Sequence, residues 1–205
     1  MAEEKRQRGR LILVTGGARS GKSAFAERLV AGQNGRTAYI ATAQVLDSEM
    51  EYRVRLHRRR RPADWKTWEA PFDAHEALLE AGSCSDVILF DCITLYLSNM
   101  LCAQDAAALA DEDKLYEMVH EKVGRLIKAA DLLRRSGATT VFVTNEVGAG
   151  IVPENRLSRL YRDLSGLANQ QIAAAADQVY AVIAGIPVEI KALADARDYL
   201  PGITG

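Results

Sequence analysis

Short, fully apolar runs alternate along this chain with segments in which apolar residues recur every three or four positions. The apolar runs predict strands over 11–15, 37–42, 87–90, 139–145 and 179–184, with shorter strands near 65–69 and 188–190. The recurring segments predict helices over 22–31, 48–60, 74–80, 112–135 and 156–176. Strands that are apolar on both faces and separated by helices are typical of a parallel sheet buried between helices. We therefore expect an α/β fold with a mostly parallel central sheet and helices on both faces.

The pattern indicates one domain with two short extensions. The 205 residues contain no internal repeat and no linker rich in proline, glycine or serine. Residues 1–10 are polar and charged and are expected to form a tail, and residues 192–205 are expected to extend a single domain over 11–191. The chain has no run of eighteen apolar residues, so no membrane span is predicted. Residues 1–10 also lack the apolar stretch of a secretory signal, so we expect a cytoplasmic protein.

A nucleotide phosphate loop is the most specific motif in the chain. Residues 16–23 read G-G-A-R-S-G-K-S and match G-x-x-x-x-G-K-[ST], between a predicted strand and a predicted helix as this motif requires. The three glycines are expected to take positive φ and to turn backbone N–H groups toward phosphate oxygens. Lys22 is expected to reach the β- and γ-phosphates, and Ser23 to ligate Mg²⁺. The predicted nucleotide-binding residues of the loop are Gly16, Gly17, Ala18, Arg19, Ser20, Gly21, Lys22 and Ser23.

Two acidic residues follow predicted strands and are expected at the same edge of the sheet. Asp91 comes directly after V-I-L-F, and Glu146 follows the strand over 139–145. Open parallel sheets bind their ligands at the carboxyl ends of the strands. We predict that Asp91 is catalytic and binds Mg²⁺, directly or through water, and that Glu146 is a second candidate acid. The alternative for Asp91 is a cap on a helix that follows it.

Charge is balanced over the whole chain but concentrated in one segment. Lysine and arginine total 26 and the acidic residues total 27, which argues against a protein held to nucleic acid or membrane by bulk charge. Residues 53–61 nevertheless contain six arginines, one histidine and no acid. So much positive charge disfavours an imidazolium, so His57 is expected to be neutral and able to attack the α-phosphorus of a nucleotide. The alternatives are a packing histidine and a solvated arginine face.

Cysteine usage adds no further site. The three cysteines, Cys84, Cys92 and Cys102, are odd in number, and no two have C-x-x-C spacing. Neither a disulfide framework nor a zinc site is therefore predicted. We expect all three to be small buried residues in a reducing compartment.

Four stretches of the sequence carry a resemblance to a known enzyme family. They are LVTGGARSGKSAFAE (13–27), YIATAQVLDSEMEYRVRLHRRRRPADWKTWE (39–69), LFDCITLYLSNML (89–101) and VTNEVGAGIVPENRLSRLYRDLSGLANQQIAAAADQVYAVIAGIPVEIK (143–191). With these stretches the chain resembles the bifunctional adenosylcobinamide kinase/adenosylcobinamide-phosphate guanylyltransferases of cobalamin biosynthesis. One departure is Tyr96, where many members carry Trp.

The resemblance implies a P-loop NTPase-like fold and roles for particular residues. His57 corresponds to the histidine that takes up GMP from GTP. The other positions that the resemblance places against GTP are Ala41, Thr42, Ala43, Arg58, Arg59, Arg60, Arg61, Glu69 and Asp91. In the fourth stretch Arg162, Asp163, Gly166 and Asn169 share one helix face, where we expect either a substrate or subunit contact or helix packing.

The resemblance implies two successive transfers. ATP or GTP phosphorylates adenosylcobinamide with the help of Mg²⁺, and His57 then passes GMP from GTP to adenosylcobinamide phosphate and releases pyrophosphate. No nucleic-acid partner is implied, and a homo-oligomer is expected, with a trimer favoured and with 105–128 as a candidate interface.

Three other functions remain open at this point. The first is a P-loop small-molecule kinase without guanylyltransferase activity, in which His57 is structural. The second is a nucleic-acid-binding module that uses the arginines, which the lack of interleaved aromatic residues disfavours. The third, a signalling GTPase, is disfavoured because N-E-V-G follows the strand over 139–145 in place of N-K-x-D.

Overall fold

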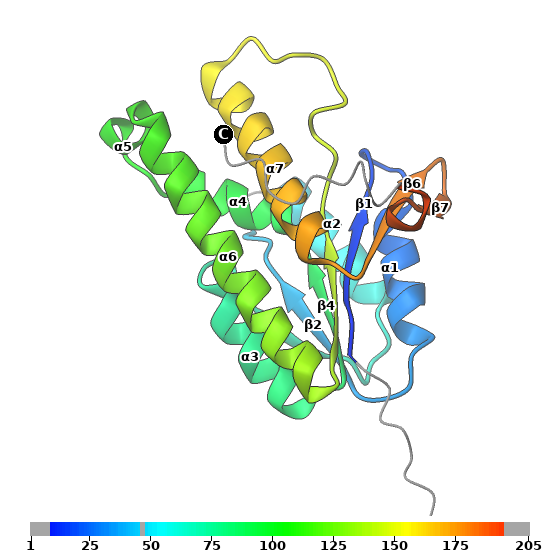
Figure 1. The fold of residues 1–205 in the computed structure, drawn as a ribbon. Helices are drawn as coiled ribbons and strands as arrows, with labels where there is room; N and C mark the ends of the chain where they lie inside the picture. The colour runs from blue at the N-terminus through cyan, green and yellow to red at the C-terminus, as the bar shows by residue number, and fades with distance from the viewer. Residues whose placement is uncertain (1–8, 46–47, 195–205) are drawn as a thin grey trace, which may run out of the picture.

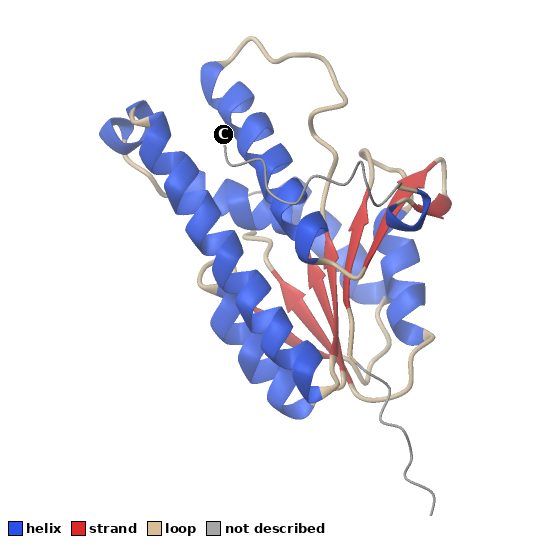
Figure 2. Ribbon diagram, viewed as in Figure 1, coloured by secondary structure: helices blue, strands red, loops and turns tan. Residues whose placement is uncertain are grey.

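The protein is a sheet covered by helices on both faces (Figures 1 and 2). The structure is a computed structural model that describes residues 9–45 and 48–194. Within the helix at 48–60, the side chains of residues 49, 50, 53, 56, 57 and 60 lie outside the described part. In the described ranges no helix is long and apolar enough to cross a membrane.

The sheet has seven strands, of which six are parallel. The strands are β1 (Leu11–Thr15), β2 (Thr37–Ala41), β3 (Lys66–Glu69), β4 (Val87–Asp91), β5 (Thr139–Val143), β6 (Gln178–Ile183) and β7 (Ile186–Glu189). Their order across the sheet is β3-β2-β4-β5-β1-β6-β7. Among the strands of the described residues only β7 runs antiparallel, because a two-residue turn at Ala184 and Gly185 joins it to β6. The prediction of a mostly parallel sheet is confirmed.

Helices pack on both faces because the strand residues alternate between two apolar cores. Leu11 and Leu13 belong to the core beneath α3 (Ala74–Cys84), α4 (Ile93–Cys102), α6 (Glu112–Ser136) and α7 (Arg156–Ala175). Ile12 and Val14 point the other way, into the core beneath α1 (Lys22–Ala31). Helix α2 (Ser48–Arg60) connects β2 to β3, and a short α5 (Ala106–Ala110) precedes α6. A 3₁₀ turn, Lys191–Leu193, follows β7.

Two helices, α4 and α5, were not predicted from the sequence, and each omission has a physical reason. Helix α4 has seven buried residues among its ten, so it shows no polar face from which a helical period can be read. Helix α5 is a single short turn, capped by the Asp105 side chain that accepts a hydrogen bond from the amide of Ala108 at 2.8 Å.

The cysteine prediction is correct in part. All three cysteines are free, but only Cys92 is buried, whereas Cys84 is half-buried and Cys102 is exposed. Burial raises the pKa of the Cys92 thiol to about 11, so this thiol is protonated at neutral pH.

Two helix glycines give a matched test of this packing. A methyl group at Gly82 would lie 2.2 Å from a terminal carbon of buried Leu133, where α3 meets α6, whereas one at Gly166 meets nothing within 4 Å. We expect Gly82→Ala to lower the free energy of unfolding by about 1–2 kcal/mol, since overpacking outweighs the better helix propensity of alanine. Gly166→Ala should raise it by about 0.4–1 kcal/mol. Urea unfolding of both variants measures the difference, and equal effects would contradict the described α3–α6 contact.

Candidate active site

The parallel register places the predicted site residues in one row at the edge where the strands end, here called the carboxyl edge. Ala41 pairs with Glu69 on one side and with Asp91 on the other, and Asp91 in turn pairs with Val143. Val143 pairs with Val14, one residue before β1 ends and two residues before the phosphate loop (16–23) begins. Paired residues that are 28 (Ala41 and Glu69) to 129 (Val14 and Val143) positions apart in sequence therefore meet because the sheet is parallel.

The phosphate loop joins β1 to α1, but its glycines serve different purposes. Only Gly21 has positive φ (94°), so the prediction of positive φ at Gly16 and Gly17 is wrong. Gly16 is required by close approach, since a Cβ there would lie 2.5 Å from the carbonyl oxygen of Val182. A Cβ on Gly17 would meet nothing within 4 Å. Arg19 takes the second left-handed conformation of the loop, with φ of 58°.

The turn between β6 and β7 supports the loop from outside. The amide of Gly185 donates to the carbonyl oxygen of Ser20 at 2.8 Å, and the Cα of Gly185 lies 3.2 Å from where a Cβ of Gly21 would be. Both residues of this turn, Ala184 and Gly185, have positive φ, as a two-residue hairpin turn requires. The antiparallel hairpin at the sheet edge therefore fixes the shape of the phosphate loop.

Lys22 and Asp91 occupy the same electrostatic environment. The ammonium group of Lys22 donates to the carbonyl oxygen of Gly17 at 3.1 Å. Burial lowers the pKa of Lys22, and the nearby Cys92 and Asp91 act in the opposite direction. Asp91 does not cap α4, whose first turn follows Cys92, so the capping alternative is not supported. The structure thus brings together the lysine and the acid that the sequence assigned to one site.

A buried tyrosine connects Asp91 to the helix that carries His57. The Tyr39 hydroxyl donates to Oδ2 of Asp91 at 2.9 Å. Burial, with the negative charge of Asp91, raises the pKa of Tyr39 well above its usual value, so the hydroxyl remains a donor at neutral pH. The guanidinium of Arg61 lies 3.3 Å from the centre of the Tyr39 ring and donates to Oγ1 of Thr67 at 3.3 Å. Arg61 directly follows α2, so the end of this helix is anchored to the Asp91 side of the site.

A second contact anchors the end of α2 to β3. Arg58 forms an ion pair with Glu69, and both side chains are largely exposed. The backbone of α2 runs through His57, one residue before Arg58, but the side chains of His57 and Arg60 lie outside the described residues. Arg59 is exposed. The structure therefore places the backbone of the predicted nucleophile beside the carboxyl edge.

Thr42 has a structural role that the sequence did not indicate. Its side chain is buried, its hydroxyl donates to the carbonyl oxygen of Cys92, and it accepts from the Cys92 amide, both at 2.8 Å. Asn99, a residue that the sequence analysis missed, donates to the Thr42 carbonyl oxygen at 2.7 Å. Because the one hydroxyl proton is already used, the Thr42 side chain fixes the turn after Asp91 and does not donate to a ligand. Ala41 and Ala43, on either side, are half-buried.

The donor set fits a magnesium ion that keeps most of its water. Among the described residues no group of three or more histidine, cysteine, aspartate or glutamate side chains could hold a metal by itself. Ser23 is half-buried in the first turn of α1, and Oδ1 of Asp91 accepts no hydrogen bond from a described residue. One hydroxyl and one carboxylate are what Mg²⁺ uses when nucleotide phosphates and water complete its shell.

Comparison with known sequences decides the family. A sequence model of "Cobinamide kinase / cobinamide phosphate guanyltransferase" matches residues 12–190. This chain belongs to that family. It is 43% identical over 184 residues to the bifunctional adenosylcobalamin biosynthesis protein CobU of Escherichia coli, covering 88% of this chain and 99% of the relative. It is 44% identical to CobU of Salmonella typhimurium, again covering 88% of this chain and 99% of the relative. The corresponding figure for CobP of Pseudomonas aeruginosa is 42%, over 87% of this chain and 96% of the relative.

The polar face of α7 in this cobinamide kinase family member is used in part for packing. Asn169 is buried, accepts from the Thr144 hydroxyl at 2.7 Å and donates to the carbonyl oxygen of Asn145 at 3.1 Å. Arg162 and Asp163 form an ion pair with each other. Of the two readings of this face, packing is therefore the correct one for Asn169.

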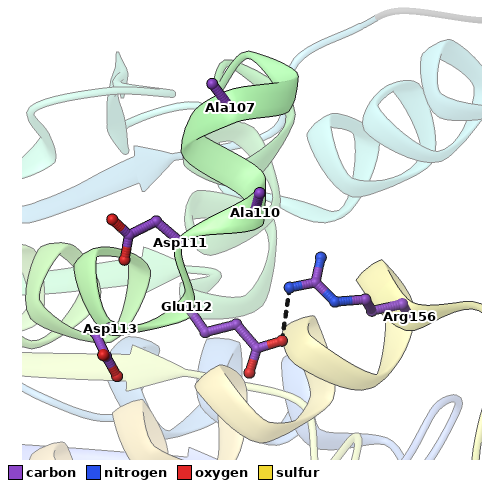
Figure 3. A pocket seen from close by; sticks show the side chains of 6 residues that line it. All are labelled: Ala107, Ala110, Asp111, Glu112, Asp113 and Arg156. Carbon is purple, nitrogen blue, oxygen red and sulfur yellow. Dashed lines mark hydrogen bonds and ion pairs between the residues drawn. The ribbon is translucent and has the colours of Figure 1, made fainter.

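The structure also has an open hollow that does not include the phosphate loop. Its volume is about 550 Å³. Figure 3 shows its lining residues, where α5 and the start of α6 face the start of α7. Arg156 crosses it to form an ion pair with Glu112 at 2.7 Å. Five of its six lining residues belong to 105–128, the segment predicted as a candidate interface, and none was predicted as a catalytic or nucleotide-binding residue.

Two adjacent loop glycines test the geometry of the phosphate loop. We expect Gly16→Ala to lower the free energy of unfolding by about 2–3 kcal/mol, because the added methyl group would meet a backbone oxygen of β6 that cannot move aside. Gly17→Ala is the control and should change it by less than about 0.5 kcal/mol. Chemical unfolding without nucleotide measures both, and a neutral Gly16→Ala would contradict the described contact.

Proposed function

We propose that this protein phosphorylates adenosylcobinamide and then transfers GMP from GTP to the product, which gives adenosylcobinamide-GDP and pyrophosphate. The observation that carries the proposal is the family match over residues 12–190 together with the meeting of Lys22, Asp91 and the end of α2 at one sheet edge. The catalytic domain is residues 11–191, and residues 1–10 and 192–205 are extensions without an assigned role. The corrinoid is a substrate in both steps.

The first step is phosphoryl transfer at the phosphate loop. ATP or GTP lies with its phosphates against residues 16–23, and Lys22 neutralises the charge that develops on the transferred group. The bond of the Lys22 ammonium to a loop carbonyl oxygen supports this role, since the group is held in place before the substrate arrives. Ser23 and Asp91 would hold Mg²⁺, which would offset the negative charge of the phosphates.

The second step uses His57 as a nucleophile. Its neutral imidazole attacks the α-phosphorus of GTP, the bond to the pyrophosphate oxygen breaks, and GMP is held on the ring nitrogen. An oxygen of the phosphate group of adenosylcobinamide phosphate then forms a bond to the phosphorus of the bound GMP, and the bond from that phosphorus to the ring nitrogen of His57 breaks. The position of His57 one residue before the Arg58–Glu69 ion pair supports this assignment, because that pair and Arg61 fix the end of α2.

GTP in the second step is proposed to contact the row at the carboxyl edge. The proposed residues are Ala41, Ala43, Arg58, Arg59, Arg60, Arg61, Glu69 and Asp91, with Thr42 contributing backbone only. Glu69 and Arg58 neutralise each other in the present structure, so binding of GTP would exchange this pair for contacts with guanine and phosphate. On family resemblance alone, we also propose that the protein is cytoplasmic and is a homo-oligomer, with a trimer favoured.

Separate substitutions should remove the two activities separately. Lys22→Ala should slow phosphorylation of adenosylcobinamide by about 100-fold or more, because a preorganised cation is lost from the transition state. His57→Asn should abolish acid-labile, base-stable labelling of the protein by GTP carrying labelled α-phosphate. Lys66→Ala and His120→Ala, at exposed positions away from the phosphate loop, are matched controls that should retain both activities.

The same assay rejects the competing functions. If wild-type protein phosphorylates the corrinoid but takes up no label, the chain is a kinase without guanylyltransferase activity. If His57→Asn labels as well as wild type, another residue carries GMP.

A further inference from the structure

The segment after β5 is fixed at four points beside the phosphate loop. The amide of Thr144 donates to the carbonyl oxygen of Val14 at 3.0 Å, and the amide of Glu146 donates to the carbonyl oxygen of Gly16 at 3.1 Å. From the other side, buried Asn169 of α7 accepts from the Thr144 hydroxyl and donates to the Asn145 carbonyl oxygen. In Figure 1 this segment passes the end of β1 before it turns toward the start of α7. The backbone of Glu146 is therefore held against the first residue of the loop.

Glu146 follows the strand that lies between the strand of Asp91 and the strand that leads to the phosphate loop of Lys22. Strand β5 has β4, which ends in Asp91, on one side and β1, which leads to the phosphate loop, on the other. Val143 pairs with Asp91, and Glu146 follows three residues beyond that row. Position 146 therefore lies at the same edge at which the phosphates are proposed to lie.

The two acids of the edge have different surroundings. Asp91 is half-buried, accepts from Tyr39 and lies close enough to Lys22 to affect its pKa. Glu146 is exposed, and among the described residues its carboxylate accepts only a long bond of 3.3 Å from the amide of Gly148, with no ion pair. Two carboxylates in such different environments are suited to different tasks. Asp91 is suited to bind metal beside the phosphates, whereas Glu146 can accept a proton from a substrate.

We propose that Glu146 is the general base of the phosphoryl-transfer step, an inference that rests on the proposed function. The carboxylate of Glu146 takes the proton of the substrate hydroxyl as its oxygen forms a bond to the γ-phosphorus. The bond between that phosphorus and the bridging oxygen breaks, and the nucleoside diphosphate leaves with the electron pair. The transfer of GMP through His57 does not need this residue, because the substrate of that step is already a phosphate.

Glu146→Gln tests the proposal, since glutamine keeps the size of the side chain but cannot take up the proton. In single-turnover reactions with ATP, Mg²⁺ and adenosylcobinamide, we expect phosphorylation to slow by about 100-fold or more. The dissociation constant for ATP and the labelling of His57 by GTP should stay within twofold of wild type. Glu146→Asp should recover part of the rate. Glu154→Gln, an exposed glutamate of the same loop, is the matched control and should behave as wild type.

Several results would overturn the role of Glu146. Phosphorylation by Glu146→Gln within threefold of wild type would exclude it as the base. Recovery of the rate at high Mg²⁺ would mean that the residue binds metal instead. An equal loss of His57 labelling would mean that the substitution damages the site as a whole. Wild-type protein that does not phosphorylate adenosylcobinamide would contradict the proposed function itself, and this role with it.

Discussion

The hydrogen bond from Tyr39 to Asp91 connects the two halves of the carboxyl edge. On one side of it Asp91 acts on Lys22 in the phosphate loop, and on the other the Tyr39 ring supports Arg61 at the end of α2. The bond is partly buried, and the raised pKa of Tyr39 keeps its hydroxyl protonated at neutral pH. Tyr39 of β2, which belongs neither to the phosphate loop nor to the arginine-rich end of α2, therefore fixes the position of these two parts relative to each other.

The arrangement explains how one sheet edge can serve two transfers. The phosphate loop is rigid because Gly16 lies against β6 and because the turn at Gly185 supports Ser20. The end of α2 is held in the present structure by the Arg58–Glu69 ion pair and by Arg61 over the Tyr39 ring. Both sets of contacts reach the sheet, which places the loop and the end of the helix at the same edge. Preorganised charges of this kind stabilise transferring phosphoryl groups at little cost of reorganisation.

Most of the fold could be predicted because its strands are short, fully apolar runs that end in polar residues. Asp91 and the phosphate loop were found for the same reason, since each follows such a run. The apolar character of α4 hid its helical period, and the antiparallel direction of β7 depends on a turn whose conformation the sequence does not specify. Sequence order also does not reveal that β5 inserts between β4 and β1.

The parts of the site that were missed are residues whose role depends on tertiary contacts. Tyr39 and Asn99 lie within buried segments and are indistinguishable from core residues until their partners are known. Thr42 was expected to contact GTP, but its hydroxyl proton is already donated to the carbonyl oxygen of Cys92. The three glycines of the loop look equivalent in the motif, yet only Gly21 needs positive φ, and Gly16 is required by its distance from Val182.

The most direct test of this coupling is the rate of each transfer in Tyr39→Phe protein, which retains the ring under Arg61 but loses the bond to Asp91. We expect phosphorylation of adenosylcobinamide and uptake of GMP from GTP both to slow by about 10-fold or more, since a hydrogen bond to a charged group contributes about 1.5–3 kcal/mol. Tyr180→Phe is the matched control, because its hydroxyl contacts only Gln178 among the described residues. If either rate in Tyr39→Phe stays within twofold of wild type, the bond between Tyr39 and Asp91 does not connect the two halves of the site.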